Sequence, residues 1–385
     1  MLSRRSLLMT GGAAILVAGG YVGTQIFRDA PSVREPWAQA EAGFGDVRLD
    51  ALAYAILAPN PHNRQPWWVE LKGEQDLALF CDLDRRLPET DPPNRQITIG
   101  LGAFIELYRM AAAEKGYRAE IEPFPFGEPE PLLDDRPIAH IQLQKDLNVE
   151  RDPLFEYTLA RRTVRAVFDE TPVSSETLAE LKSSAGLADA DLFTTTRSPN
   201  EVQSLINICC EGWSIELNKS ATHHESNLLT RVGAKEVAAN PDGISLYGPQ
   251  MEAFRMMGLL DKKKMEDPSS RAFSETFKYY NALITSSRAF GWLTSRGNSR
   301  KQQLEAGANW VRINLAATKM GLAMHPLSQV LQEFPEMDGP YKELHDLLSI
   351  EQPARVQGLF RFGYAKYPQP SPRWPMMSRL ATLDA

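Results

Sequence analysis

The sequence predicts an α+β protein made of two related halves, with a helical insert in the second half. Three observations predict this class: short strand-like runs joined by a turn in residues 67–83, strong helical patterns at residues 97–115 and 301–320, and a repeat that relates those two helices. With 385 residues and a net charge of −7, the chain is long enough for about two domains with hydrophobic cores.

The two helical patterns match at a constant spacing along the chain. Gly307 follows Gly102 by 205 residues, Gly321 follows Gly116 by the same interval, and an alanine pair in each helix fits the same spacing. Small residues let a helix approach its neighbour closely, and a glycine can end it. The match indicates a dimer fused into one chain, although chance and common helix composition would also produce it.

The expected elements follow from hydrophobic periodicity and from turn residues. In the first half they are a helix at 46–57, a hairpin of strands at 67–71 and 77–83, a helix at 97–115, strands at 117–121 and 138–143, and an exposed Pro-rich loop at 123–137. In the second half they are a helix at 154–160, a helix introduced by 172–176, mostly helical chain at 199–300 interrupted at 240–243, a helix at 301–320, and a strand at 355–365 before a Pro-rich tail. Because residues 199–300 have no counterpart in the first half, we expect them to form an inserted helical cover.

Composition excludes several classes of protein. Hydrophobic residues make up 43% and charged residues 24%, a balance typical of globular proteins and not of disordered or polytopic ones. No basic block offers a footprint for nucleic acid. Cys81, Cys209 and Cys210 show no zinc-binding spacing, so a scaffold held together by disulfides or a metal is excluded.

The first forty residues predict a targeting segment. Arg4 and Arg5 precede an apolar, glycine-rich stretch that ends near Gly23, which resembles a twin-arginine export signal; an uncleaved anchor helix is the alternative. Residues 38–40, Ala-Gln-Ala, have the form of a cleavage site. We therefore expect residues 1–40 to be a signal segment for the twin-arginine export machinery, residues 41–150 and 151–385 to be the two halves, and the mature protein to be periplasmic or exported.

The segment 58–68, Ala-Pro-Asn-Pro-His-Asn-Arg-Gln-Pro-Trp-Trp, is the first candidate site. Asn60, Asn63 and Gln65 bring amides that both donate and accept hydrogen bonds, and the prolines and tryptophans stiffen the chain around them. Such a rigid polar edge suits a planar heteroaromatic ring with alternating donors and acceptors. The alternative is an ordinary turn before a core strand.

A second candidate site is rich in arginine. Arg161, Arg162, Thr163 and Arg165 bring forked guanidinium groups and a hydroxyl, which can bind a phosphate through charge-assisted hydrogen bonds. The alternative is a solvated helix end. Arg373, in the proline-stiffened C-terminal tail, could complete the phosphate clamp.

Together these segments resemble the nitroreductase family of FMN-dependent enzymes, and within it the Acg-like branch, in which two nitroreductase halves are fused. The run at 58–67 resembles the family's Asn/Gln loop, Arg-Arg-Thr-Val-Arg at 161–165 resembles its entry segment, and Arg-Phe-Gly-Tyr at 361–364 with Ser-Pro-Arg-Trp-Pro at 371–375 resembles its closing segment. The resemblance spans about residues 46–380. It implies that each half has an antiparallel β-sheet flanked by helices.

The resemblance also implies which residues bind the cofactor. They are Arg161, Arg162, Thr163, Arg165 and Arg373 around the FMN phosphate, Pro59, Asn60, Asn63 and Gln65 around the ring, and Leu327, Ser328 and Gln329 beside it. Since the first half lacks the arginine segment and the second half lacks the loop, we expect a single FMN at the junction of the halves and an empty pseudo-equivalent site. No metal and no catalytic side chain is required.

The implied function is hydride or electron transfer through the flavin to a small organic acceptor. The electron donor stays open between NAD(P)H and a redox partner. His62 and His325 could relay protons, but we interpret both as hydrogen-bonded structural residues. Two alternatives remain: a flavin-storage protein whose insert covers the FMN, and a binding module for a ligand that is not a flavin. We expect a monomeric pseudo-dimer and no nucleic-acid partner.

Overall fold

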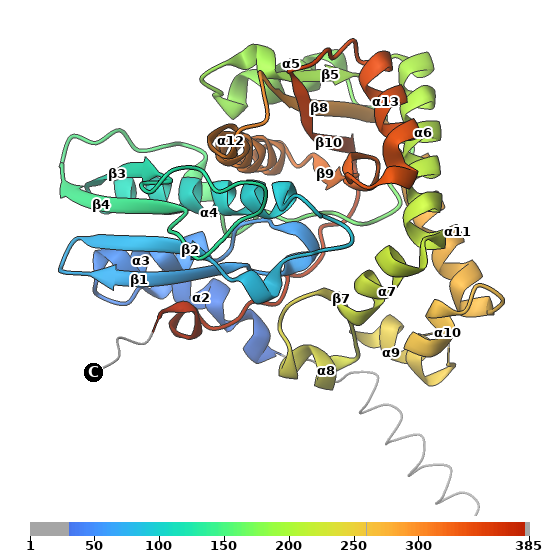
Figure 1. Ribbon diagram of the computed structural model, residues 1–385, viewed down its shortest axis with the longest axis horizontal. Helices are drawn as coiled ribbons and strands as arrows, with labels where there is room; N and C mark the ends of the chain where they lie inside the picture. The colour runs from blue at the N-terminus through green and yellow to red at the C-terminus, as the bar shows by residue number, and fades with distance from the viewer. Residues whose placement is uncertain (1–30, 259, 382–385) are drawn as a thin grey trace, which may run out of the picture.

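The computed structural model describes residues 31–258 and 260–381 (Figure 1). The helices and strands of the first half are α2 (Glu35–Ala42), α3 (Val47–Ala55), β1 (Trp67–Lys72), β2 (Asp76–Cys81), α4 (Arg95–Glu114), β3 (Tyr117–Pro123) and β4 (Ala139–Lys145). Those of the second half are α5 (Ser175–Ala185), β5 (Phe193–Thr196), α6 (Pro199–Asn218), α7 (Ser220–Leu228), β6 (Thr230–Val232), α8 (Ala234–Ala239), β7 (Ile244–Leu246), α9 (Pro249–Met256), α10 (Lys262–Glu266), α11 (Arg271–Thr285), β8 (Ala289–Ser295), α12 (Arg300–Lys319), β9 (Ala323–Pro326), α13 (Asp338–Leu347) and β10 (Arg355–Gly363).

Each half is built around one four-stranded antiparallel sheet, and the two sheets share one topology. Their strand orders are β1-β2-β4-β3 and β5-β8-β10-β9, with every neighbouring pair antiparallel. Each strand of the first sheet therefore has a counterpart in the second, and α4 leads into β3 as α12 leads into β9. The predicted α+β fold of two fused, sheet-and-helix halves is confirmed.

The two halves meet where α4 crosses α12, at the centre of the molecule (Figure 1). A Cβ atom on Gly102 would lie 2.0 Å from the Leu304 carbonyl oxygen, and one on Gly307 would lie 1.9 Å from the Ile99 carbonyl oxygen. Both distances are far inside van der Waals contact, so only glycine fits at either position. The repeat found in the sequence therefore marks the axis that relates the two halves.

A pair of buried arginines, which was not predicted, also follows this repeat. Arg95 begins α4 and Arg300 begins α12, at the same spacing as the two glycines. Arg95 reaches the second half, where its Nε donates to Glu333 at 2.6 Å; Arg300 reaches the first half, where its Nη1 donates to the Pro93 carbonyl at 2.8 Å. The two halves thus hold each other through reciprocal contacts, as the subunits of a two-fold dimer do.

The insert comprises α6 to α11 and the small parallel pair β6–β7, and it lies between β5 and β8 (Figure 1). The prediction extended it to residue 300, but β8 belongs to the second sheet. Six of the seven β8 residues are buried, so the strand shows no hydrophobic alternation that would have distinguished it.

The prediction of a helix at residues 154–160 is wrong. The chain there forms only a 3₁₀ turn, Phe155–Tyr157. A stretch of seven residues is too short to be stable as a helix without tertiary packing, so its local pattern carried little information.

The chain before α3 packs onto the C-terminal tail. Trp37 of α2 is buried, its Nε1 donates to the Ser371 carbonyl at 2.9 Å, and the Arg373 amide donates to the Val33 carbonyl at 2.9 Å. The expected cleavage motif at 38–40 therefore lies inside a packed helix, and the boundary expected at residue 41 falls within the folded body. Ala40 is buried in this packing and Ala38 is exposed, and cleavage at this motif stays a prediction. The arginine pair at residues 4 and 5 lies outside the described residues.

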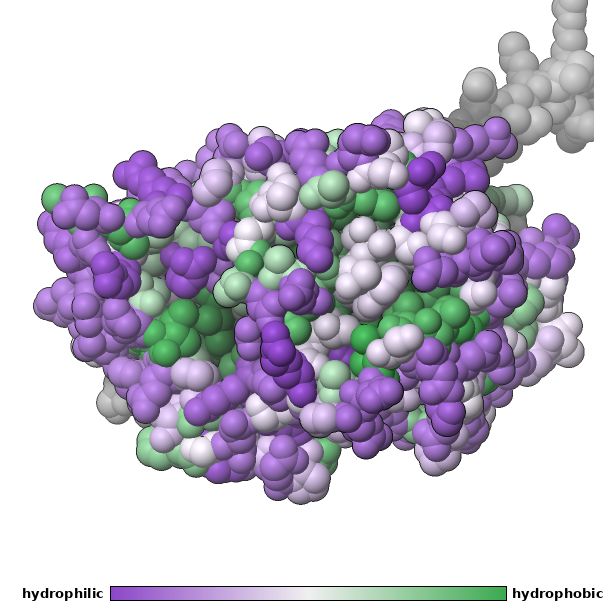
Figure 2. Space-filling view, turned by 90° about the horizontal axis from the view of Figure 1, so that it is seen from above, coloured by the Kyte–Doolittle hydropathy of each residue, from purple (hydrophilic) through white to green (hydrophobic). Residues whose placement is uncertain are grey.

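The surface of the described part is mainly hydrophilic on the face seen in Figure 2, with hydrophobic residues in small separate areas. The exposed large hydrophobic side chains are scattered along the chain, from Phe126 and Leu147 in the first half to Met257 and Tyr279 in the insert. Among the described helices, none is both long and apolar enough to cross a membrane.

Candidate functional site

Arg161 is a buried arginine at the junction of the two halves. Its Nη2 donates to the Leu57 carbonyl of the first half at 2.9 Å, and its Nη1 donates to Asn314 Oδ1 on α12 at 3.0 Å. Its Nε is buried and has no hydrogen-bond partner among the described residues. A buried donor without a partner is costly, so this atom indicates a missing acceptor.

Arg373 comes from the C-terminal tail and binds the same stretch of the first half. Its Nε donates to the Ile56 carbonyl at 2.9 Å, its Nη2 to the Leu57 carbonyl at 3.0 Å, and its Nη1 to Asn63 Oδ1 at 2.7 Å. Arg161 and Arg373 therefore share the Leu57 carbonyl, and both second-half arginines lie against the start of the first-half Asn/Gln loop.

A third arginine, Arg162, completes a cluster of like charge with Arg161 and Arg373. The indole of Trp37 lies under two of them, 4.9 Å from the Arg162 guanidinium and 5.5 Å from that of Arg373. Within the described chain, no carboxylate forms an ion pair with any of the three.

The lack of a counterion has an electrostatic cost for this arginine cluster. Burial, with Arg162 adding to it, lowers the pKa of Arg161 to about 9, and burial together with Arg161 lowers the pKa of Arg373 well below its ordinary value. An anion bound here would offset both effects, because opposite charge favours the protonated guanidinium. Three fork-shaped donors and one unpartnered N–H fit a phosphate group.

The Asn/Gln loop has a strained backbone. His62, Asn63 and Gln65 have φ angles of 47°, 50° and 52°, in the left-handed region that non-glycine residues rarely adopt. Such conformations persist only where surrounding contacts impose them, and they are frequent at functional sites.

The amides of the loop supply many of those contacts. Asn60 Oδ1 accepts from the Gln65 amide at 2.7 Å, and Gln65 Oε1 accepts from the Trp374 amide of the tail at 2.9 Å. Gln65 is fully buried, and its Nε2 donates to the Pro241 carbonyl of the insert at 2.8 Å. Asn63 Nδ2 donates to the Pro372 carbonyl at 3.1 Å. The amides of Asn63 and Gln65 thus hold the loop against the tail and the insert, and their contact with a bound ring stays a prediction.

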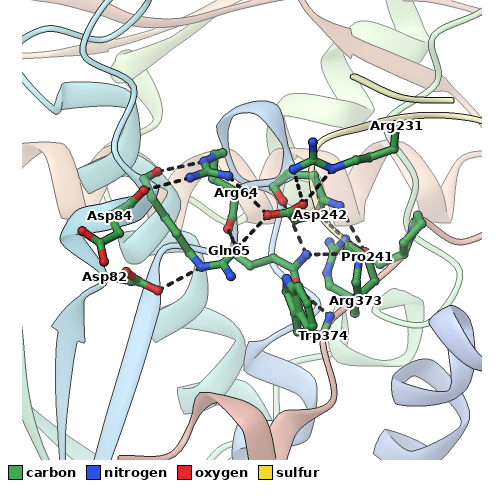
Figure 3. A network of polar contacts seen from close by, with 12 residues as sticks. Arg64, Gln65, Asp82, Asp84, Arg231, Pro241, Asp242, Arg373 and Trp374 are labelled. Atoms are coloured by element: carbon green, nitrogen blue, oxygen red, sulfur yellow. Dashed lines mark hydrogen bonds and ion pairs between the residues drawn. The ribbon is translucent and has the colours of Figure 1, made fainter. Parts of the chain in front are cut away.

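One buried carboxylate, Asp242, clamps the insert onto this loop (Figure 3). It accepts from Arg64 Nη1 at 3.2 Å, from Arg85 Nη1 at 2.8 Å and from Arg231 Nη2 at 2.8 Å. Arg64 and Arg85 belong to the first half and Arg231 to the insert. From the sequence, residues 240–243 were predicted only as an interruption between helices. The Asn-Pro-Asp-Gly motif indicates a turn, but it gives no sign of which residues the carboxylate contacts.

Asp242→Asn is expected to lower the free energy of unfolding by about 3 kcal/mol, because it leaves the mostly buried guanidinium groups of Arg64 and Arg231 without their counterion. Arg85 would lose one of its two carboxylate partners and keep Asp82. Urea denaturation of the two proteins measures the difference. Asp134→Asn is the matched control, since its ion pair with Arg136 is exposed and is expected to contribute less than about 1 kcal/mol. Equal losses in the two variants would contradict the assigned role of Asp242.

The remaining predicted residues come from both halves: Pro59 and Asn60 from the first, and Thr163, Leu327, Ser328 and Gln329 from the second. Thr163 and Ser328 are half-buried, Pro59 and Asn60 likewise, and Leu327 is buried with its amide bound to the Leu359 carbonyl at 2.8 Å. Gln329 Nε2 donates to the Tyr280 hydroxyl of α11 at 3.0 Å.

Arg165 differs from the other arginines of its segment. It is exposed and forms no hydrogen bond or ion pair with any described residue. Its positive charge lowers the pKa of four groups from other segments: His62, His325, Tyr280 and Glu216. In each of them, burial has a larger effect on the pKa than Arg165 has. Arg165 therefore lies within electrostatic range of titratable side chains of the loop, of β9 and of the insert.

The site holds no candidate metal centre: across the described ranges, no group of three or more His, Cys, Asp or Glu side chains could bind an ion.

Comparison with known proteins defines the class. The model of the nitroreductase family matches residues 158–364, more than half of the chain, and the chain therefore belongs to that family.

Among individual relatives, a Mycobacterium tuberculosis protein, acg, whose name proposes NAD(P)H nitroreductase activity, is 28% identical over 343 residues, which cover 86% of this chain and 93% of the relative. A second, uncharacterised protein of the same species is 32% identical over 126 residues, or 31% of this chain and 35% of the relative. Among solved structures, the FMN-dependent nitroreductase NfnB of Mycobacterium smegmatis in complex with NADPH is 14% identical, with a TM-score of 0.35 over 57% of this chain and 92% of that one.

Proposed function

We propose that this protein is an FMN-dependent oxidoreductase of the nitroreductase type, with one FMN bound at the junction of its two halves. The observation that carries the proposal is the buried arginine cluster, which has no carboxylate partner and meets the Asn/Gln loop of the other half at the Leu57 carbonyl. Family membership and the names of the relatives, which refer to FMN and NAD(P)H, agree with it.

The chain's own residues have separate tasks in this proposal. Arg161, Arg162 and Arg373, with Thr163, bind the phosphate. Arg165 and the amide loop contact the ring, and the positive charge of Arg165 stabilises the negative charge that the reduced ring carries. When bound, FMN supplies the hydride chemistry.

Two features support a single cofactor per chain. At the position corresponding to the arginine segment, the first half has Arg48, whose charge is already paired with Asp46 at 2.7 Å. In the first half, the amide loop follows α3. The corresponding segment of the second half follows α5 and reads Gly-Leu-Ala-Asp-Ala-Asp at 186–191, with two carboxylates and no amide side chain. Asp189 is paired with Arg296 at 2.6 Å, and the negative charge of Asp191 would disfavour an anionic flavin there.

The visible absorption spectrum of the purified protein tests the proposal. We expect the spectrum of oxidised flavin, one FMN per chain after extraction, loss of colour on anaerobic addition of NADPH, and its return on addition of 4-nitrobenzoate or 1,4-benzoquinone. A colourless protein that takes up no FMN would instead support a binding module for another ligand.

A flavin-storage role is the second candidate, and the insert is the observation that favours it. The Asp242 clamp and the contacts of Glu225 with the Thr90 amide and hydroxyl, at 3.0 and 2.6 Å, close the insert over the first half. In the same experiment, reoxidation only by oxygen, and by neither added acceptor, would identify storage.

The electron donor and the cellular location of the protein are also part of the proposal. We infer NAD(P)H as the donor from the relatives' names, with a redox partner as the alternative, and export by the twin-arginine route from the first residues. An exported protein would have to keep residues 31–42, because Trp37 packs against the arginine cluster. The two halves would then comprise residues 31–150 and 151–381.

A further inference from the structure

The insert supplies a buried acid next to the Asn/Gln loop. Glu216 of α6 is 4% exposed, and one of its oxygens, Oε2, accepts from Gln332 Nε2 at 2.9 Å. Its other oxygen, Oε1, accepts from the Ser226 hydroxyl of α7 at 3.3 Å. Ser226 Oγ lies 3.2 Å from Nε2 of His62 in the loop. A continuous line of hydrogen bonds therefore joins the insert to the candidate cofactor site.

The direction of these bonds follows from the number of protons. A serine hydroxyl has a single proton, so when Ser226 donates to Glu216 it can only accept from His62, which then carries its proton on Nε2. When Glu216 is protonated, the carboxyl can donate to Ser226, and Ser226 can donate to Nε2, which places the His62 proton on Nδ1. No described residue hydrogen-bonds Nδ1 of His62.

The surroundings favour neutral groups along this line. Burial lowers the pKa of His62 to about 3, with Arg165 and Arg64 adding to the effect. Burial raises the pKa of Glu216 to about 7; the hydrogen bonds from Gln332 and Ser226 and the charge of Arg165 act against this, while the carboxylate of Glu225 adds to it. Tyr280 of α11 is a further titratable group within electrostatic range of Glu216. The carboxyl is thus positioned to give up a proton near neutral pH, and His62 can pass it on by exchanging tautomers without becoming charged.

We propose that Glu216, Ser226 and His62 form a proton relay to an electron acceptor bound at the loop, with His62 as the residue that donates the proton. This rests on the proposed function. The relay serves an acceptor whose reduction leaves a negative charge on oxygen.

The step balances as follows. The acceptor receives a hydride, with its two electrons, from the reduced cofactor and becomes an oxyanion. The bond between Nδ1 of His62 and its proton breaks as the O–H bond of the product forms. The Ser226 proton moves to Nε2, and the Glu216 proton moves to Ser226 Oγ. The relay is reset by one proton from water, which binds Nδ1 of His62 as Nε2 returns its proton to Ser226 and Ser226 returns its own to the Glu216 carboxylate.

Rapid-mixing measurements on the reduced, FMN-loaded protein test the relay, with 4-nitrobenzoate as acceptor. For Ser226→Ala we expect the reoxidation rate constant to fall about 100-fold, the loss typical of a removed proton donor, with FMN affinity and the rate of reduction by NADPH unchanged. Ser226→Thr keeps the hydroxyl and is expected to restore the rate. His224→Gln, on the same helix but exposed, is the matched control and is expected to behave as the unchanged protein.

The pH profile separates a relay from a structural role. Because Glu216 must be protonated to donate, the reoxidation rate should be highest below pH 7 and fall as the pH rises through about 7. For Glu216→Gln, which keeps the shape of the side chain, the rate should be low and independent of pH.

A second readout needs no cofactor. The chain has six histidines, so nitrogen NMR of histidine-labelled apoprotein can assign the His62 tautomer. We expect the Nε2–H form above pH 7 and a loss of that preference in Ser226→Ala. A wild-type reoxidation rate and pH profile in Ser226→Ala, in protein that binds FMN, would overturn the relay alone. A chain that takes up no FMN overturns the proposed function and the relay together.

Discussion

Gly307→Ala is expected to lower the free energy of unfolding by about 3 kcal/mol or more, because the added methyl group overpacks the helix crossing. The new Cβ would lie 1.9 Å from the Ile99 carbonyl oxygen and 2.8 Å from the Ala103 amide nitrogen. Both are backbone atoms, so α4 and α12 would have to move apart and the two halves would lose their closest contact. Urea denaturation followed by circular dichroism measures the change.

Gly339→Ala is the matched control, since Gly339 also lies in a helix, α13, but nothing lies within 4 Å of the Cβ that it would gain. There the helix propensity of alanine is expected to leave stability unchanged or to raise it by up to about 1 kcal/mol. A Gly307→Ala protein as stable as the control variant would show that the crossing is looser than the distances indicate.

Arg161→Gln combined with Arg373→Gln is expected to weaken FMN binding at least about 100-fold, since each charge-assisted hydrogen bond contributes about 1.5–3 kcal/mol and a tenfold change in affinity corresponds to about 1.4 kcal/mol. The reason is the loss of the positive charge that no described carboxylate balances. Titration of the apoprotein with FMN, followed by flavin fluorescence, measures the affinity.

A comparison of FMN with riboflavin distinguishes two roles of these arginines, phosphate binding and stabilisation of the fold. Both arginines also hold the first-half chain at Leu57, so the double variant is expected to lose some stability. A general loosening would weaken FMN and riboflavin equally, whereas loss of a phosphate site weakens FMN far more, because riboflavin has no phosphate. Arg136→Gln, an exposed arginine paired with Asp134, serves as the control variant. Equal losses for the two flavins would refute the phosphate assignment.

Much of the fold could be predicted because its signals are local. The α3 and α4 helices, the β1–β2 hairpin and α12 each showed periodicity or turn residues within their own segments, and the structure has all of them. The buried strand β8 and the short strands β5 and β9 were missed, since a strand buried on both faces shows no alternation and a strand of four residues shows little pattern.

In the candidate site, too, the residues with a local sequence signal could be predicted and the others could not. Arg161, Arg373 and the Asn/Gln loop stood out as motifs, and the structure brings these three together at one carbonyl group. The function of the loop amides could not be predicted, because Gln65 contacts residues more than 170 positions away, in the insert and in the tail. Asp242 and Glu216 were missed for the same reason: a carboxylate in a helical insert has no local signal that says whether it is buried or what it meets.

Spacing and side-chain chemistry are properties of the chain alone, so they were enough to indicate two related halves, the repeat that relates two helices, and the segments that carry the amides and the arginines. Four features became visible in the folded molecule alone: α4 and α12 cross each other, and Trp37 belongs to the folded body. Asp242 joins three arginines, and Glu216 reaches His62 through Ser226. Burial and partnership are properties of packing between distant segments, and packing is settled by the whole core at once.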